Sequence, residues 1–269
     1  MTDIRPAAVA GRFYPDDPKK LRAMLEEYHE GADRKRQTAI VAPHAGYIYS
    51  GKFAGAVYKR TEIPETVFVL CPNHTGRGSM ISVWARGAWQ TPLGDVPMDE
   101  ERAAELLDKL QVAEDHEAHE FEHAIEVHLP FLQYANPDVK IVPVVLGPLR
   151  AADCLKVGAR LAEMKPDLLV ASTDMSHYIS ADEAKKQDAL AIAPMERLDP
   201  MGLYRAVESN DISMCGFIPT VAVLEAAKCL GSDHSRLLAY GSSGEKTGDF
   251  QSVVAYAALE ISPQLGEIP

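Results

Sequence analysis

The sequence predicts a single-domain α/β/α sandwich with a mainly parallel central sheet. Short apolar runs rich in Val, Ile and Leu recur along the chain without polar alternation, as is typical of strands buried on both faces. Stretches with helical spacing of apolar residues separate these runs, and this alternation favours a parallel sheet covered by helices on both sides. The 269 residues contain no linker-like or repeated segment, so we expect one domain over residues 1–269.

The expected elements follow in chain order from these patterns. The first helix is Pro18–Glu30, in which Leu21, Met24 and Leu25 share one face. Apolar residues with the same spacing predict further helices at Asp99–Leu110, Ala151–Met164 and Pro219–Cys229. The expected strands are Thr38–Ala42, Thr66–Cys71, Lys140–Leu146, Asp167–Ala171, Arg236–Tyr240 and Ser252–Ala258. The segment Ile81–Met98 breaks the alternation, so we expect an inserted hairpin or a long functional loop there.

Composition excludes several classes of function. The chain has 27 basic and 39 acidic residues, a formal net charge of −12, so we expect no nucleic-acid partner and no anionic membrane partner. No stretch reaches the roughly 18 apolar residues that a membrane span requires. Hydrophobic residues make up 46% and charged residues 25%, which is ordinary globular usage and excludes wholesale disorder.

The cysteines and residues 1–20 predict the cellular compartment. Cys71, Cys154, Cys215 and Cys229 are far apart and form no C-x-x-C pair, which excludes a disulfide framework and a zinc ribbon. Residues 1–20 lack the apolar run of a secretory signal. We therefore expect reduced thiols in a cytoplasmic protein.

Polar residues follow four of the predicted strands at the point where each strand ends. His44 follows the first, His74 the second and Asp174 with His177 the strand at 167–171. A fourth loop, Gly241–Glu245, follows the strand at 236–240. Because the carboxyl ends of parallel strands open on one edge of a sheet, we expect these groups to form one site.

Imidazoles gathered in this way favour a metal ion. Neutral imidazole is the commonest side-chain metal ligand, and two His with one carboxylate suit non-haem Fe(II). Other chemistries have weaker support. No G-x-S-x-G elbow is present, Cys71 and Cys215 are typical of small buried residues, and the loop 241–244 offers only backbone N–H groups to an anion.

A competing motif lies in the middle of the chain. His119-Glu120-Phe121-Glu122-His123 spells H-E-x-x-H, the helical signature of zinc proteases. On a helix His119, His123 and Glu126 would share a face, and Phe121 would begin a buried stripe that continues through Ile125, Leu129 and Leu132. The segment is crowded with Glu and His, however, and a protease leaves the four strand ends unexplained. The simpler interpretation of this segment is the solvated start of a helix, where acidic residues near the N-terminus are favourable.

Seven pieces of the chain, in order, resemble one protein family, the Memo family. They are Gly11-Arg12-Phe13-Tyr14-Pro15, Ala42-Pro43-His44-Ala45-Gly46-Tyr47 with Ser50-Gly51, Pro72-Asn73-His74, Thr91-Pro92-Leu93-Gly94, Glu122-His123-Ala124-Ile125-Glu126-Val127-His128-Leu129-Pro130, Ser172-Thr173-Asp174-Met175-Ser176-His177, and Gly248-Asp249 through Tyr256-Ala257. Prokaryotic members of this family are often encoded with radical-SAM partner proteins. The pieces run in family order across nearly the whole chain, and together they are highly specific.

The resemblance implies a fold like that of the LigB-type extradiol dioxygenases, in which two His and one Glu hold Fe(II) at the sheet edge. It also implies that the matching pocket contains His44, His74 and His177 with Asp174. Family members are associated with iron or copper and with redox roles, without an agreed substrate.

One position departs from the family's animal members, which carry a metal-binding Cys where this chain has Lys246. An ammonium group is a poor ligand, which puts a Cu(I)–thiolate site in doubt, and the adjacent Glu245 offers a carboxylate instead. Our hypothesis is that His44, His74 and Glu245 hold Fe(II), with Cu or Zn as alternatives. His177 then acts as acid/base, or is itself a ligand, and Asp174 orients it.

Further residues have expected roles around that ion. We expect the substrate to contact Tyr47, Tyr49, Asn73, Ser243 and Cys215. We expect Glu122, His123 and Glu126 to hold the metal-ligating side chains in place. For the two tyrosines, ordinary packing is the alternative. The expected function is a dioxygenase-like, metal-dependent redox enzyme acting on a small molecule. The alternatives are a non-catalytic metal- or peptide-binding scaffold and, third, the zinc protease. The sequence leaves open a homo-oligomer.

Overall fold

A computed structural model describes residues 4–263, and an eight-stranded sheet forms its centre. The strand order is β10-β11-β2-β8-β3-β7-β4, and β9 pairs with β11 off this path. The strands are β2 (Ala39–Ala42), β3 (Thr66–Pro72), β4 (Ile81–Val83), β7 (Lys140–Leu146), β8 (Leu169–Ser172), β9 (His177–Ile179), β10 (His234–Ser242) and β11 (Val253–Ser262). All six predicted strands belong to this sheet.

The four middle strands, β2, β8, β3 and β7, run parallel. β4 and β11 flank them in the antiparallel sense. Because β10 is antiparallel to β11, it runs in the same direction as β2. The carboxyl ends of β2, β3, β8 and β10 therefore meet at one edge of the sheet, as predicted.

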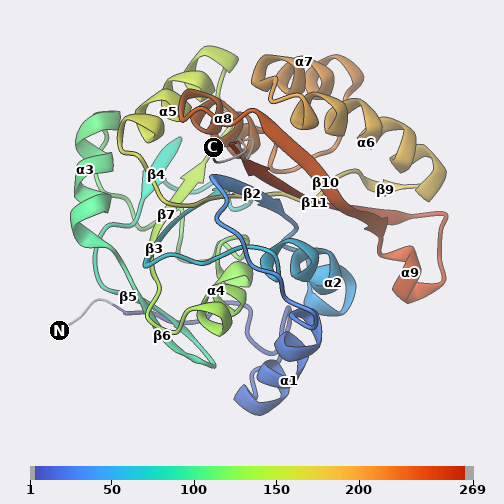
Figure 1. The fold of residues 1–269 in the computed structure, drawn as a ribbon, viewed down its shortest axis with the longest axis horizontal. Coiled ribbons are helices and arrows are strands. Elements are labelled where there is room, and N and C mark those ends of the chain that lie inside the picture. The colour runs from blue at the N-terminus through green and yellow to red at the C-terminus, as the bar shows by residue number, and fades with distance from the viewer. Residues whose placement is uncertain (1–3, 264–269) are drawn as a thin grey trace, which may run out of the picture.

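Helices cover both faces of the sheet, which confirms the predicted α/β/α sandwich (Figure 1). One face packs against α1 (Pro18–Tyr28), α2 (Tyr47–Tyr58) and α4 (Leu129–Ala135). The other packs against α3 (Glu100–Leu110), α5 (Ala151–Glu163), α6 (Ala181–Glu196), α7 (Pro200–Asn210) and α8 (Phe217–Cys229). A short 3₁₀ helix, η1 (Glu126–His128), precedes α4, and α9 (Gly244–Thr247) follows β10. None of the helices within residues 4–263 has the length and the apolar run needed to cross a bilayer.

Both faces of the central strands are buried, which explains why their sequences show no polar alternation. In β2, Ala39 and Val41 belong to the core under α5 and α8, whereas Ile40 and Ala42 belong to the core under α2 and α4. Each of these four residues has no exposed surface.

A small second sheet holds the N-terminal part of the described chain. It consists of β1 (Ile4–Arg5), β5 (Ala88–Thr91) and β6 (Gly94–Pro97), and β5 and β6 form the hairpin that residues 81–98 predict. The Arg5 guanidinium lies 4.1 Å from the centre of the Trp89 ring and pairs with the buried Glu126 carboxylate at 2.7 Å. These contacts fix the segment 119–126 beside the main sheet.

That segment is not the helix that the H-E-x-x-H motif requires. Residues His119–Phe121 form turns, and Glu122 and His123 are in irregular structure. Phe121, expected at the start of a buried stripe, is 65% exposed, whereas Glu122 is fully buried. The helical protease geometry and the solvated helix start are therefore both wrong.

Candidate metal centre

Three strand ends bring His44, His74 and Asp174 together. Each residue lies two positions beyond the last residue of β2, β3 or β8, respectively. All three line a cavity of about 690 Å³ at the carboxyl edge of the sheet. The ring centroids of His44 and His74 are 5.1 Å apart, as a shared ion requires.

A thiol completes a candidate set of metal ligands. One nitrogen from each of His44 and His74 and the Cys215 sulfur all lie within 4.8 Å of one another. His44 Nε2 and Cys215 Sγ are 3.4 Å apart. A tetrahedral ion with bonds of about 2.05 Å to nitrogen and 2.3 Å to sulfur separates these atoms by about 3.6 Å. The spacing therefore fits one ion, and three protein ligands leave a fourth position for water or substrate.

A buried hydrogen-bond network fixes the tautomer of His44. Ser172 Oγ donates to the Ala124 carbonyl oxygen at 2.9 Å, which uses its one proton. It therefore accepts from both His44 Nδ1, at 2.7 Å, and His128 Nε2, at 2.8 Å. His128 Nδ1 in turn accepts from the Tyr58 hydroxyl at 3.0 Å. With its proton on Nδ1, His44 keeps the Nε2 lone pair for a metal ion.

Glu122 orients His74 in a comparable way. Its carboxylate accepts from His74 Nδ1 at 2.9 Å and from the His74 backbone N–H at 2.6 Å. Burial disfavours the imidazolium, but the hydrogen bond and charge of Glu122 outweigh it and raise the pKa of His74. Burial likewise favours the neutral acid, but the bond from His74 outweighs it and lowers the pKa of Glu122. Because Glu122 holds the Nδ1 proton, the neutral His74 ring presents Nε2 as its ligand atom, and an ion that binds there displaces the second proton of the imidazolium.

His74, Glu122 and His123 form a second candidate set, with ligand atoms also within 4.8 Å of one another. Glu122 Oε1 already accepts from His74 Nδ1 and from the Ala124 N–H at 3.0 Å, and lies 3.3 Å from His123 Nδ1. Since these contacts occupy the carboxylate, it is better placed to support imidazoles than to bind an ion.

Burial controls the protonation states of two of the candidate ligands. Burial, followed by the charges of neighbouring imidazoles, lowers the pKa of His44 well below its usual value, so the ring is neutral. Burial and the Asp174 charge raise the pKa of the Cys215 thiol. An ion bound to this sulfur therefore displaces a proton.

Two groups around the set are suited to proton transfer. Burial raises the pKa of Asp174 to about 6, although hydrogen bonds from the His44 and Ala45 backbone oppose the shift. His177 Nδ1 lies 2.9 Å from the Ser213 carbonyl oxygen, an acceptor, so Nδ1 carries the proton and Nε2 is free to accept one. The expected orientation of His177 by Asp174 differs from these contacts: Asp174 Oδ1 accepts from the His44 N–H at 2.9 Å, and Ser213 orients His177.

Four expected site residues have other contacts. Glu245 pairs with Lys52 of α2 and accepts from the Ser242 N–H, and it is not among the described residues that line the cavity. Tyr47 is 1% exposed, and its hydroxyl donates to the Val127 carbonyl, so it is a core residue. Glu126 holds Arg5 and the N-terminal segment. Asn73 shapes the loop that carries His74 by accepting from the Gly76 N–H and donating to the Arg77 carbonyl.

Of the other expected residues, Tyr49, Ser243, Cys215, His177 and His123 line the cavity, together with several that sequence reasoning missed. Glu122 is not among the lining residues and contacts His74 instead. The missed residues that line the cavity include Phe13, Tyr178, Ser213 and Tyr256, and those of the network behind it include Tyr58 and His128. His128 belongs to a motif quoted for the family resemblance and so had a sequence signal, whereas Ser213 and Tyr178 had none.

Comparisons with known proteins agree on one family. A family model described as Memo-like protein matches residues 5–260. A MEMO1 family protein of Aquifex aeolicus is 44% identical over 262 residues, covering 95% of this chain and 98% of the relative. Others from Methanopyrus kandleri and Methanosarcina mazei are 41% and 40% identical, covering 95% and 96% of this chain and 98% of each relative.

The fold also has a solved counterpart. The crystal structure of an uncharacterized protein from Escherichia coli K12 matches 82% of this chain and 99% of its own, with a TM-score of 0.54 and 19% identity. This likeness concerns the fold alone.

Proposed function

Because this chain belongs to the Memo-like family, and because its sheet edge gathers three ligand atoms under a cavity, we propose that it is a metal-dependent redox enzyme acting on a small molecule. His44, His74 and Cys215 hold one iron or copper ion, and the substrate binds in the 690 Å³ cavity beside them. The observation that carries this proposal is the convergence of two imidazoles and a thiol within 4.8 Å of one another.

The donor set decides which metals are candidates. Imidazole suits Fe, Cu and Zn, and a thiolate adds a preference for softer ions. This chain has Lys246 where the animal members of the family have a metal-binding Cys. Cys215 supplies a sulfur ligand from a different position, which again favours copper as an alternative to iron. Of these ions only iron and copper are redox-active, and we therefore assign the site to one of them.

Each nearby group has a role around that ion. A bound ion supplies Lewis-acid and one-electron chemistry. Asp174, with a pKa of about 6, exists in both protonation states near neutral pH and exchanges a proton with the substrate. His177 Nε2 faces no competing hydrogen bond among those of the described residues and takes a second proton at the cavity wall. Ser172 and Glu122 keep the two ligand imidazoles in place.

A non-catalytic binding role is the second candidate, and one observation favours it. Aromatic side chains lie at the cavity with much of their surface exposed: Tyr178 is 78% exposed and Tyr49 is 36% exposed. Such rings suit contacts with a peptide as well as with a small aromatic substrate.

Two measurements test the proposal. The protein is loaded anaerobically with Fe(II) and, separately, with Cu(I), and the affinity is measured against a competing chelator. We expect one ion per chain, with binding lost in His44→Ala, strongly weakened in Cys215→Ser, and unchanged in the control Cys154→Ser, whose buried thiol lies in α5. A wild-type protein that binds neither ion contradicts the metal centre.

The second measurement is O₂ uptake by the loaded protein with a panel of catechols and other phenols. The enzyme proposal predicts uptake that is lost in His44→Ala. Tight binding of one ion without uptake across the panel supports the scaffold role instead.

A further inference from the structure

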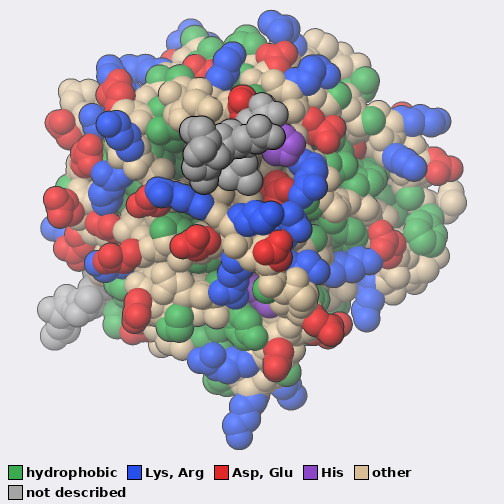
Figure 2. Space-filling model, in the orientation of Figure 1, with side chains coloured by type: hydrophobic (Ala, Val, Ile, Leu, Met, Phe, Trp, Pro, Cys, Tyr) green, Lys and Arg blue, Asp and Glu red, His purple; other side chains and the backbone are tan. Residues whose placement is uncertain are grey.

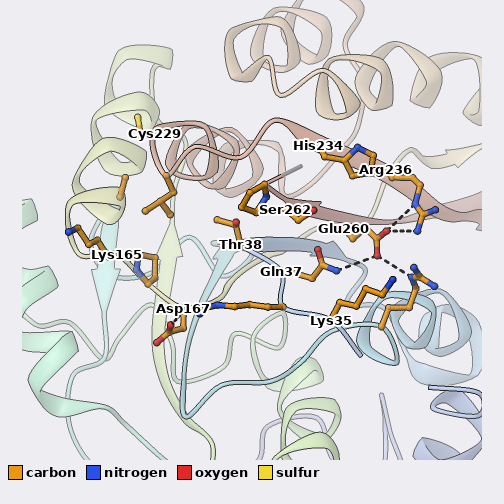
Figure 3. A pocket seen from close by; sticks show the side chains of 16 residues that line it. Lys35, Gln37, Thr38, Lys165, Asp167, Cys229, His234, Arg236, Glu260 and Ser262 are labelled. Carbon is orange, nitrogen blue, oxygen red and sulfur yellow. Dashed lines mark hydrogen bonds and ion pairs between the residues drawn. The ribbon is translucent and has the colours of Figure 1, made fainter. Parts of the chain in front are cut away.

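We propose that a second cavity, at the opposite edge of the sheet, binds a small phosphate ester that carries hydroxyl groups. This cavity has a volume of about 1320 Å³ and lies where β2 and β8 begin, where β10 begins and where β11 ends. Gln37 and Thr38 lie between Lys165 on one side and Arg236 on the other (Figure 3). The inference is independent of the metal centre.

The cavity lining is cationic in an acidic protein. The lining contains five cationic side chains and two carboxylates, although the whole chain has a net charge of −12. The cations are Lys35, Arg36, Arg60, Lys165 and Arg236, and the carboxylates are Asp167 and Glu260. Figure 2 shows several Lys and Arg side chains near the centre of this face, with Asp and Glu side chains among them. A local excess of positive charge in a concave surface attracts anions.

A buried carboxylate holds two guanidinium groups in place. Glu260 is 5% exposed and accepts from Arg60 Nε at 3.1 Å and from Arg236 Nε at 3.0 Å. Two cations on one carboxylate leave a net positive charge, and each guanidinium keeps further N–H donors. Lys165 has no carboxylate within ion-pair distance in residues 4–263. Fixed guanidinium groups of this kind match the geometry of a phosphate group.

An unpartnered buried atom in the same lining points to a hydroxyl group on the ligand. Gln37 is 5% exposed, and its Oε1 has no hydrogen-bond partner, while its Nε2 lies 3.5 Å from Glu260. A carbonyl oxygen accepts only, so it needs an O–H or N–H donor from a bound molecule. An anion without a donor leaves this atom unsatisfied.

The lining of this cavity also contains apolar side chains. Ala162, Pro166 and Leu230 are among them. They offer contact to a carbon skeleton, which an inorganic ion lacks. The lining therefore matches a ligand with a phosphate at the Arg60–Arg236 side, a hydroxyl at Gln37 and a carbon skeleton between the walls.

Calorimetric titration with three probes tests this assignment. Glucose 6-phosphate carries both charge and hydroxyls, glucose carries hydroxyls alone, and sulfate carries charge without a donor. We expect saturable binding of glucose 6-phosphate with a Kd of about 1 mM or below, and at least about tenfold weaker binding of the other two. Absence of saturable glucose 6-phosphate binding up to about 10 mM overturns the proposal, as does equal affinity for glucose or for sulfate.

Matched variants locate the binding. Lys35→Glu/Lys165→Glu reverses two charges in the cavity, and Lys185→Glu/Lys186→Glu reverses two exposed charges on α6. We expect at least about tenfold loss in the first and less than about twofold in the second, because Lys185 and Lys186 do not line the cavity and salt screens exposed charges. Gln37→Met should weaken glucose 6-phosphate binding several-fold and leave sulfate binding unchanged. Equal losses in the two lysine pairs, or no effect of Gln37→Met, contradict the assigned site.

Discussion

Ser172 Oγ lies 2.7 Å from His44 Nδ1 and 2.8 Å from His128 Nε2, so one hydroxyl joins a candidate metal ligand to a second buried imidazole. The hydroxyl proton is donated to the Ala124 carbonyl, and both rings must therefore donate to the serine oxygen. The hydrogen bonds behind the site thus determine which nitrogen of His44 faces the cavity.

Replacing Ser172 tests this relationship. In Ser172→Ala the His44 ring loses its fixed orientation and tautomer, and we expect metal affinity to fall by about 10- to 100-fold. Chelator competition measures the change. The control is Ser176→Ala, an equally buried serine whose hydroxyl bonds to Asp188 instead. Equal metal affinity in both variants contradicts the role of the network.

Glu245 was expected to be a ligand, and its contacts predict the opposite. Its carboxylate pairs with Lys52, so Glu245→Ala should leave Fe(II) affinity within about twofold of wild type under anaerobic loading. His44→Ala, measured beside it, should lose the ion. A tenfold or larger loss of affinity in Glu245→Ala shows that the carboxylate reaches the ion.

Glu126 should matter for stability rather than for the metal. It is fully buried, pairs with the buried Arg5, and accepts from the Ala8 and Val9 N–H groups and the Tyr14 hydroxyl. Glu126→Ala leaves the guanidinium uncompensated and should lower the free energy of unfolding in urea by about 3–5 kcal/mol. The control Glu120→Ala removes an exposed carboxylate and should change it by less than about 1 kcal/mol. A small effect of Glu126→Ala refutes this role.

Two buried imidazoles predict how stability depends on pH. Burial lowers the pKa of His128 and of His119 to about 3, with the Arg5 charge contributing at His119. Both rings stay neutral in the folded protein, whereas the unfolded chain binds protons below about pH 6.5. Stability should therefore fall with decreasing pH between about 6.5 and 3, by about 1 kcal/mol per ring from pH 7 to 5.5.

Urea unfolding at these two pH values measures that loss. In His119→Leu one titrating ring is gone, so the decrease in stability between pH 7 and 5.5 should be smaller by about 1 kcal/mol. An unchanged decrease means that His119 is not neutral in the folded protein.

The strands were predictable because burial on both faces leaves a run of apolar residues in the sequence. The helices with one polar face, such as α3, were predictable for the same local reason. By contrast, α2 has no polar face and was missed: most of its side chains are buried, and a Cβ at Gly51 would lie 2.5 Å from the Tyr28 ring. Close packing of this kind depends on a residue far away in the sequence.

The strand-end rule located the site but did not determine which side chains point into it. Tyr47 and Tyr49 are two residues apart, yet only Tyr49 lines the cavity. The sequence predicts Cys215, like Cys71, to be a small buried residue, and the family resemblance adds an expected substrate contact but no metal contact. Cys215 reaches His44, 171 positions away, because Gly216 packs on the end of β8, where a Cβ would lie 2.2 Å from the Ser172 carbonyl oxygen.

An anaerobic crystal structure of the metal-loaded protein, with anomalous scattering recorded at the metal's absorption edge, tests the central claim most directly. We predict one peak within about 2.0–2.2 Å of His44 Nε2 and His74 Nε2 and about 2.3 Å from Cys215 Sγ. A peak bound by Glu245, or one near His119 and away from His44 and His74, would contradict the assigned metal centre.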